Sequence, residues 1–245
     1  MASRRYFLQK TLMFSPLVVW PNSLFRLLQN DLPNVLILGD SISIGYTPFV
    51  REMLKGKANV YRPMLENGKP ENCAGTTKGV ENIDRWLNSA GNAGITNSGS
   101  HWDIIHFNFG LHDIKHVDPV TGKNSQNPKH PKQANRRHYK KNLKTIVEKL
   151  KATGAELIFA TTTPYPDDVN GPLRKPGMPR KYNRVAVKIM NKNGIRINNL
   201  HAFMVPRMNE LQRPNNVHFT KKGSRALAGK VVERINEVIY EINNS

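Results

Sequence analysis

The sequence predicts an α/β protein built on a parallel β-sheet with helices on both faces. Short apolar runs alternate along the chain with longer amphipathic stretches, as strands alternate with helices in such folds. Gly154 and Gly194 directly follow two of the amphipathic stretches, where a left-handed residue would end a helix before the next strand. There is no internal repeat and no second core, so one domain over residues 31–245 is expected.

The elements follow from residue periodicity. Apolar runs predict the strands, and apolar residues recurring every three or four positions predict the helices. The expected strands lie within residues 35–39, 59–63, 102–110, 155–162 and 194–199. The expected helices follow Gly39 and cover residues around 80–88, 140–154, 182–194 and 221–242.

Two segments interrupt the alternation and are predicted to be loops. Residues 115–141 are polar and basic, and residues 165–181 are rich in proline and glycine. Each follows a predicted strand, and ligands of open parallel sheets bind beyond the carboxyl ends of the strands. Both loops are therefore expected at the rim of any active site, although tolerated surface insertions would have the same composition.

Composition limits the partners. The 245 residues carry a formal net charge of +19 with a pI near 10.2, which predicts attraction to polyanions such as acidic polysaccharide, anionic lipid or nucleic acid. No motif for reading nucleic acid is present, so a specific nucleic-acid partner is not expected.

The single cysteine, Cys73, excludes an internal disulfide and is expected to be a small buried hydrophobe. The sequence is silent on oligomeric state.

The N-terminus has the order of an export signal. Arg4 and Arg5 precede the short apolar run of residues 11–20, and this arrangement is similar to a twin-arginine signal. Residues 1–30 are therefore predicted to direct the protein to the periplasm or the cell exterior. Pro16 interrupts the run and no clear cleavage site follows, so an N-terminal extension that is retained is the alternative. A transmembrane anchor is not expected, because no stretch is long and apolar enough.

A serine stands at the tip of the first predicted strand. Val35 to Leu38 lead into Gly39, Asp40 and Ser41, which places Ser41 at the N-terminus of the next helix. Unpaired backbone N–H groups and the positive end of the helix dipole would there favour developing negative charge. A serine nucleophile fits this position, and an ordinary helix cap explains the same letters.

Three further blocks lie where they can meet this serine. His218 precedes Thr220, which is expected to cap the last helix, so the imidazole would lie in a strand-to-helix loop. Gly110, His112 and Asp113 end the third predicted strand at the same edge of the sheet. Gly75 lies in a small-residue turn that leads into a helix.

Taken in order, the blocks GDSISIGY, AGTT, GLHD and VHFT resemble those of the SGNH/GDSL family of serine hydrolases. The resemblance implies a three-layer α/β/α sandwich on a five-stranded parallel sheet, and ester hydrolysis without a cofactor. It implies that Ser41 is the nucleophile and His218 the base, with the amides of Ser41 and Gly75 in the oxyanion hole. Asp40 and Asp113 are expected to support the site.

Two positions depart from the family pattern. His112 stands where the family has an asparagine that donates into the oxyanion hole, and a histidine donor would depend on pH. Asn108 is the alternative donor, since strand alternation would place it on the face of Gly110 and His112. Asn215 stands three positions before His218, where the family has an aspartate that orients the histidine. An amide oxygen, or a backbone carbonyl, could do so without supplying a charge.

The sequence thus predicts a serine esterase that removes acetyl or other small acyl groups, with a carbohydrate, which could be acidic, as the substrate. A catalytically weakened protein of the same fold that binds acidic polysaccharide is the alternative. The spacing of His112, Asp113 and His116 does not predict a metal site, because the segment follows a strand and enters a loop.

Overall fold

A computed structural model describes residues 32–89 and 101–244. The predicted export segment and the first residue of the predicted domain lie outside these residues, so both predictions stand untested. The strands are β1 (Asn34–Leu38), β2 (Asn59–Tyr61), β3 (Ile104–Phe107), β4 (Glu156–Ala160) and β5 (Arg196–Asn198). The helices are α2 (Ser41–Met53), α3 (Thr76–Leu87), α4 (Leu111–Ile114), α5 (Arg136–Lys151), α6 (Met178–Lys192), α7 (Leu200–Met204), η2 (Val205–Arg207), α8 (Met208–Leu211) and α9 (Lys221–Asn243).

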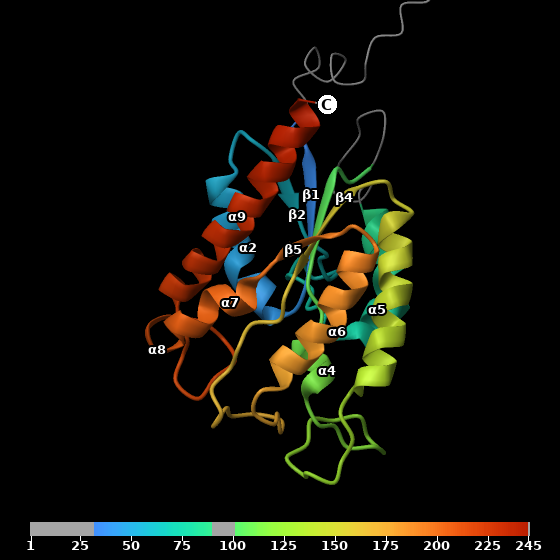
Figure 1. The fold of residues 1–245 in the computed structure, drawn as a ribbon, viewed down its shortest axis with the longest axis vertical. Helices are drawn as coiled ribbons and strands as arrows, with labels where there is room; N and C mark the ends of the chain where they lie inside the picture. The colour runs from blue at the N-terminus through green and yellow to red at the C-terminus, as the bar shows by residue number, and fades with distance from the viewer. Residues whose placement is uncertain (1–31, 90–100, 245) are drawn as a thin grey trace, which may run out of the picture.

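The five strands form one parallel sheet in the order β2-β1-β3-β4-β5. Helices α2, α7 and α9 lie on one side of it and α3, α5 and α6 on the other, which makes the three layers seen in Figure 1. Residues 35–38 of β1 and all of β3 are buried, and apart from His106 they are apolar, as expected for strands covered on both faces. The predicted α/β/α architecture is confirmed.

Local residue chemistry explains several of the helix ends. Thr220 caps α9 as expected, with its side chain accepting a hydrogen bond from the Gly223 amide at 3.0 Å. Gly154 and Gly194 have left-handed backbones, with φ of 75° and 67°. Phe107 and Phe109 are fully buried, so the aromatic residues of the third strand pack in the core.

Both rim loops are shorter than predicted, because each is followed by a helix that begins early. α5 begins at Arg136, since the Asn135 side chain accepts hydrogen bonds from the amides of Arg137 and His138. α6 begins at Met178, directly after the left-handed Gly177 and with Pro179 in its first turn. The loops lie at the lower end of the molecule in Figure 1, beyond the carboxyl ends of the strands. In the described residues, no helix is long and apolar enough to cross a bilayer.

Candidate active site

Ser41 is the first residue of α2, and only Gly39 and Asp40 separate it from the end of β1. Asp40 caps the helix, and its Oδ1 accepts a hydrogen bond from the Ile42 amide at 2.9 Å. Burial raises the pKa of the Asp40 carboxyl to about 6. The Ser41 amide has no acceptor within residues 32–89 and 101–244, so it is available at the positive end of the helix dipole.

The structure brings Ser41 and His218 into contact, although 177 positions separate them. His218 lies in the loop between α8 and α9, and α9 packs along α2 (Figure 1). The Ser41 hydroxyl and His218 Nε2 are 2.8 Å apart. This is the distance that proton transfer from a serine to a general base requires.

The other ring nitrogen of His218 is held by Asn216. The Asn216 side-chain oxygen is 2.9 Å from the backbone nitrogen of His218 and 2.8 Å from its Nδ1. A backbone N–H only donates, so the amide atom that faces it must be the oxygen. The same oxygen then requires a proton on Nδ1, which leaves Nε2 unprotonated and able to accept the proton of Ser41.

This geometry corrects the expected role of Asn215. Its side chain turns away from the imidazole and donates to an Asp168 carboxylate oxygen at 2.7 Å. The backbone of Asn215 is left-handed, with φ of 52°, and its carbonyl accepts a hydrogen bond from the Asn170 amide. The turn therefore directs the Asn215 side chain toward the second rim loop and the Asn216 side chain toward His218.

His218 is half-buried, and its surroundings disfavour the imidazolium. Burial is the largest cause that lowers its pKa, and the positive charges of Arg213 and Arg174 lower it further. These surroundings favour the neutral ring, the form in which a base accepts a proton.

The loop that carries Gly75 is tied to the end of β1. The Cys73 amide donates to the Gly39 carbonyl at 3.1 Å. Gly75 is the cap residue of α3, and its own amide has no acceptor among the residues described. A Cβ at this position would lie 3.0 Å from a carboxylate oxygen of Asp113, a tight contact that favours glycine.

Asp113 holds this turn in place from the neighbouring helix α4. Its carboxylate accepts hydrogen bonds from both the amide and the hydroxyl of Thr76, the residue after Gly75. Burial of Asp113 raises its pKa to about 7, although the bonds from Thr76 lower it. The side chain thus joins the end of β3 to the start of α3.

His112 precedes Asp113 and lies within electrostatic reach of His218. Burial, together with the nearby Lys115 and Arg174, lowers the pKa of His112 to about 3. Its imidazole is therefore neutral over the ordinary pH range and keeps a single N–H. The pH-dependent donor expected at this position is wrong for that reason.

Asn108 does not share a strand face with His112, because β3 ends at Phe107 and His112 belongs to a helix. The Asn108 side chain donates to the Ala160 carbonyl at 2.7 Å, which commits one of its N–H groups to β4. Between them the backbone turns at Gly110, where φ is 155° and a Cβ would lie 2.2 Å from the Thr162 hydroxyl. The two candidate donors therefore lie on different elements, and one side-chain N–H of Asn108 is already used.

Cys73 and His116, two other residues singled out in the sequence, lie in buried surroundings. Cys73 is fully buried, and burial raises its pKa to about 11. The imidazole of His116 lies 2.6 Å from the His130 carbonyl through Nδ1. Across residues 32–89 and 101–244, no three potential ligand side chains gather as a metal ion would require.

Sequence reasoning missed two buried arginines near the site. Arg62 binds the Gly39 and Glu71 carbonyls and the hydroxyls of Ser43 and Thr47, so it braces the turn that presents Ser41. Arg174, in the second rim loop, donates through Nε to the Leu111 carbonyl at 3.3 Å. No motif marks either residue. The contact of Asn216 with His218 could have been anticipated, because two adjacent asparagines, Asn215 and Asn216, precede Val217 in the sequence.

Comparison with known proteins agrees with this architecture. The profile of the GDSL-like lipase/acylhydrolase family matches residues 37–226. No curated protein sequence matches the chain.

Several solved structures share the fold. An acetyl xylan esterase is 15% identical, with a TM-score of 0.62 over 82% of this chain and 99% of its own. A lipase/acylhydrolase from Enterococcus faecalis is 17% identical, with a TM-score of 0.60 over 84% of this chain and 96% of its own. A catalytic mutant of an acetylxylan esterase from Geobacillus stearothermophilus is 13% identical, with a TM-score of 0.58 over 83% and 94%.

Proposed function

Because the chain belongs to the GDSL-like lipase/acylhydrolase family, we propose that it is a serine esterase that removes acetyl or another small acyl group from a carbohydrate. The observation that carries the proposal is the 2.8 Å contact between the Ser41 hydroxyl and His218 Nε2, with Nδ1 protonated against Asn216. The presence of acetyl xylan esterases among the structural neighbours supports the choice of substrate class.

In the proposed reaction, the Ser41 oxygen attacks the acyl carbonyl carbon while His218 Nε2 takes the hydroxyl proton. The oxyanion of the tetrahedral intermediate accepts hydrogen bonds from the amides of Ser41 and Gly75 and from the neutral ring of His112. His218 then gives its proton to the departing alkoxide, and the C–O bond to the sugar breaks.

The second half repeats the chemistry with water. His218 removes a proton from a water molecule, whose oxygen attacks the acyl carbon of the acyl-Ser41 intermediate. The oxyanion re-forms in the same hole. The carboxylic acid then leaves, and Ser41 recovers its proton from His218. No cofactor enters either half.

An amide in the place of the orienting carboxylate supports a second candidate, a weakly catalytic protein that binds acidic polysaccharide. Asn216 fixes the tautomer of His218 and supplies no negative charge to the imidazolium. The net charge of +19 would suit an acidic polymer. Export through the first 30 residues remains part of the proposal for both candidates.

Hydrolysis of 4-nitrophenyl acetate by the wild type and by Ser41→Ala tests the first candidate. The esterase assignment predicts a rate that disappears in Ser41→Ala, with a matched melting temperature showing that the fold is intact. If both proteins release nitrophenol no faster than the uncatalysed reaction, the esterase assignment is rejected and the binding protein is favoured. Ser43→Ala is not a suitable control, because Ser43 contacts the buried Arg62.

A further inference from the structure

Arg174 is a buried cation without an acidic partner. Its exposed fraction is 8%, and its Nε donates to the Leu111 carbonyl. Among the ion pairs of residues 32–89 and 101–244, none joins Arg174 to an aspartate or glutamate within 4.0 Å. Burial of a guanidinium is costly unless an anion compensates it. The charge of Arg174 is therefore available to a bound anion.

The guanidinium lies next to the reacting groups. Its anchor, Leu111, is the residue before His112. Asp40, His112 and His218 all lie within electrostatic reach of Arg174, whose positive charge favours the deprotonated form of each. Asp40 precedes Ser41 in the chain and His218 contacts the Ser41 hydroxyl, so a substrate whose ester reaches Ser41 lies within electrostatic reach of Arg174.

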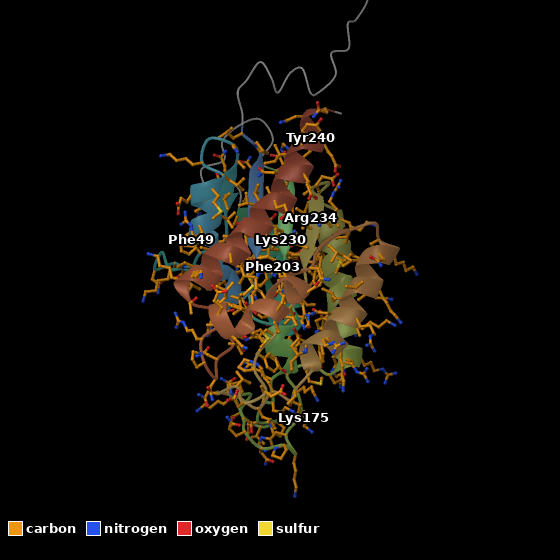
Figure 2. The ribbon with its side chains drawn as sticks, turned by 60° about the vertical axis from the view of Figure 1, so that its left-hand side comes forward. Phe49, Lys175, Phe203, Lys230, Arg234 and Tyr240 are labelled. Atoms are coloured by element: carbon orange, nitrogen blue, oxygen red, sulfur yellow. The ribbon has the colours of Figure 1, made fainter. Side chains whose placement is uncertain are left out.

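The loop holds Arg174 from both sides. Leu173 is paired with the other rim loop, where its amide donates to the Ser125 carbonyl at 2.8 Å and its carbonyl accepts from the His116 amide at 2.9 Å. On the other side, the Tyr165 hydroxyl donates to the Lys175 carbonyl at 2.9 Å. Figure 2 shows Lys175 at the lower end of the molecule, among the loops beyond the strand ends. A guanidinium fixed in this way loses little conformational entropy when it binds.

We propose that Arg174 binds a carboxylate carried by the alcohol part of the substrate, so that the preferred substrate is an acyl ester of an acidic sugar such as a uronic acid. This inference rests on the proposed function. The planar fork of a guanidinium matches the two oxygens of a carboxylate.

The position of the charged group follows from the rim rather than from the interior. The cavity lined among others by Ile42, Asn108 and Thr162 measures about 10 Å³, and neither Ser41 nor His218 lines it. It holds about one water molecule, so the carboxylate of a substrate would bind outside it. The rim, in contrast, is open and carries Lys115, Arg213 and Lys175.

The test compares two acetyl esters that differ in one charge, 4-acetoxybenzoate and its neutral methyl ester. The measured quantity is the ratio of kcat/KM for the charged ester to kcat/KM for the neutral one. Arg174→Gln should lower this ratio about tenfold, as expected for loss of a charge-assisted hydrogen bond. Arg174→Lys should lower it less, because the charge remains and the fork is lost.

Arg184→Gln is the matched control, since it removes the same charge from an exposed position on α6. The ratio should stay at the wild-type value. An equal fall in both variants would overturn the proposal in favour of the general positive field of the protein. A ratio that Arg174→Gln leaves unchanged would also overturn it, including the case in which both esters slow together.

A further pair of esters tests the acyl side. If Arg174→Gln lowers the rate of mono-4-nitrophenyl succinate relative to 4-nitrophenyl butyrate, and leaves the benzoate ratio unchanged, the charge belongs to the acyl group and the proposal is wrong.

Binding separates this inference from the proposed function. In Ser41→Ala, calorimetry should show tighter binding of 4-acetoxybenzoate than of its methyl ester, and adding Arg174→Gln should remove the difference. If the calorimetry gives this result and the wild type hydrolyses neither ester, the esterase assignment is rejected and the anion site is kept. Hydrolysis of both esters, with no charge preference in binding or rate, would reject the anion site and keep the esterase.

Discussion

The contact between Asn216 and His218 predicts the effect of a single charge on catalysis. Asn216→Asp would place a carboxylate oxygen where an amide oxygen now lies 2.8 Å from Nδ1. A hydrogen bond to a charged group contributes about 1.5 to 3 kcal/mol, and one between neutral groups about 0.5 to 1.5 kcal/mol. The difference, about 1 to 1.5 kcal/mol, appears when the imidazolium forms. It corresponds to roughly a five- to twelvefold rise in kcat/KM.

The assay is the pH dependence of kcat/KM for 4-nitrophenyl acetate. Because a carboxylate stabilises the imidazolium, Asn216→Asp should also raise the pKa of His218 and move the acidic limb of the profile to higher pH. Asn216→Ala removes the acceptor and should lower the rate at least tenfold at all pH values.

Asn215→Asp is the informative comparison. The new carboxylate would face Asp168, whose oxygen now accepts a hydrogen bond from Asn215 at 2.7 Å, so this variant should gain no activity and should lose stability. Acceleration by Asn215→Asp together with none by Asn216→Asp would refute the assignment of the orienting residue.

Three further predictions follow from the same site. Arg213→Gln removes an exposed charge that lowers the pKa of His218, so the acidic limb of the kcat/KM profile should move to higher pH. The shift should shrink in high salt, and an unchanged limb at low salt would contradict this prediction. Gly75→Ala places a Cβ 3.0 Å from Asp113 and should lower kcat roughly ten- to hundredfold with little change in KM, whereas a change confined to KM would argue against an oxyanion role. The pKa of Asp113 is raised from 3.8 to about 7. Between these two values the native state holds a proton on Asp113 that the unfolded state has lost. The resulting contribution to stability is complete below the lower value and is lost as pH rises through the upper one. Urea unfolding across that window should therefore show the wild type losing stability relative to Asp113→Asn, and parallel curves would refute it.

The mechanism of Ser41 and His218 depends on the rigidity of two short turns. Arg62 braces the first turn through four acceptors, and Asp113 holds the second through Thr76. Neither residue is placed to touch the substrate in the proposed reaction. Their hydrogen bonds fix the Ser41 and Gly75 amides before the substrate arrives, and preorganised donors of this kind account for much of the stabilisation of an oxyanion.

The sequence by itself determined the parallel sheet, the strand that ends at Ser41 and the loop that carries His218. These features depend on hydrophobic periodicity, on glycine and on helix caps, which act between residues close in the chain. The tertiary structure decided which asparagine meets His218, because a left-handed backbone at Asn215 turns one side chain outward and the next one inward. It also decided that His112 is neutral and that Arg174 is buried without an acidic partner. Burial and charge at a site depend on segments far apart in the chain, so no local pattern encodes them.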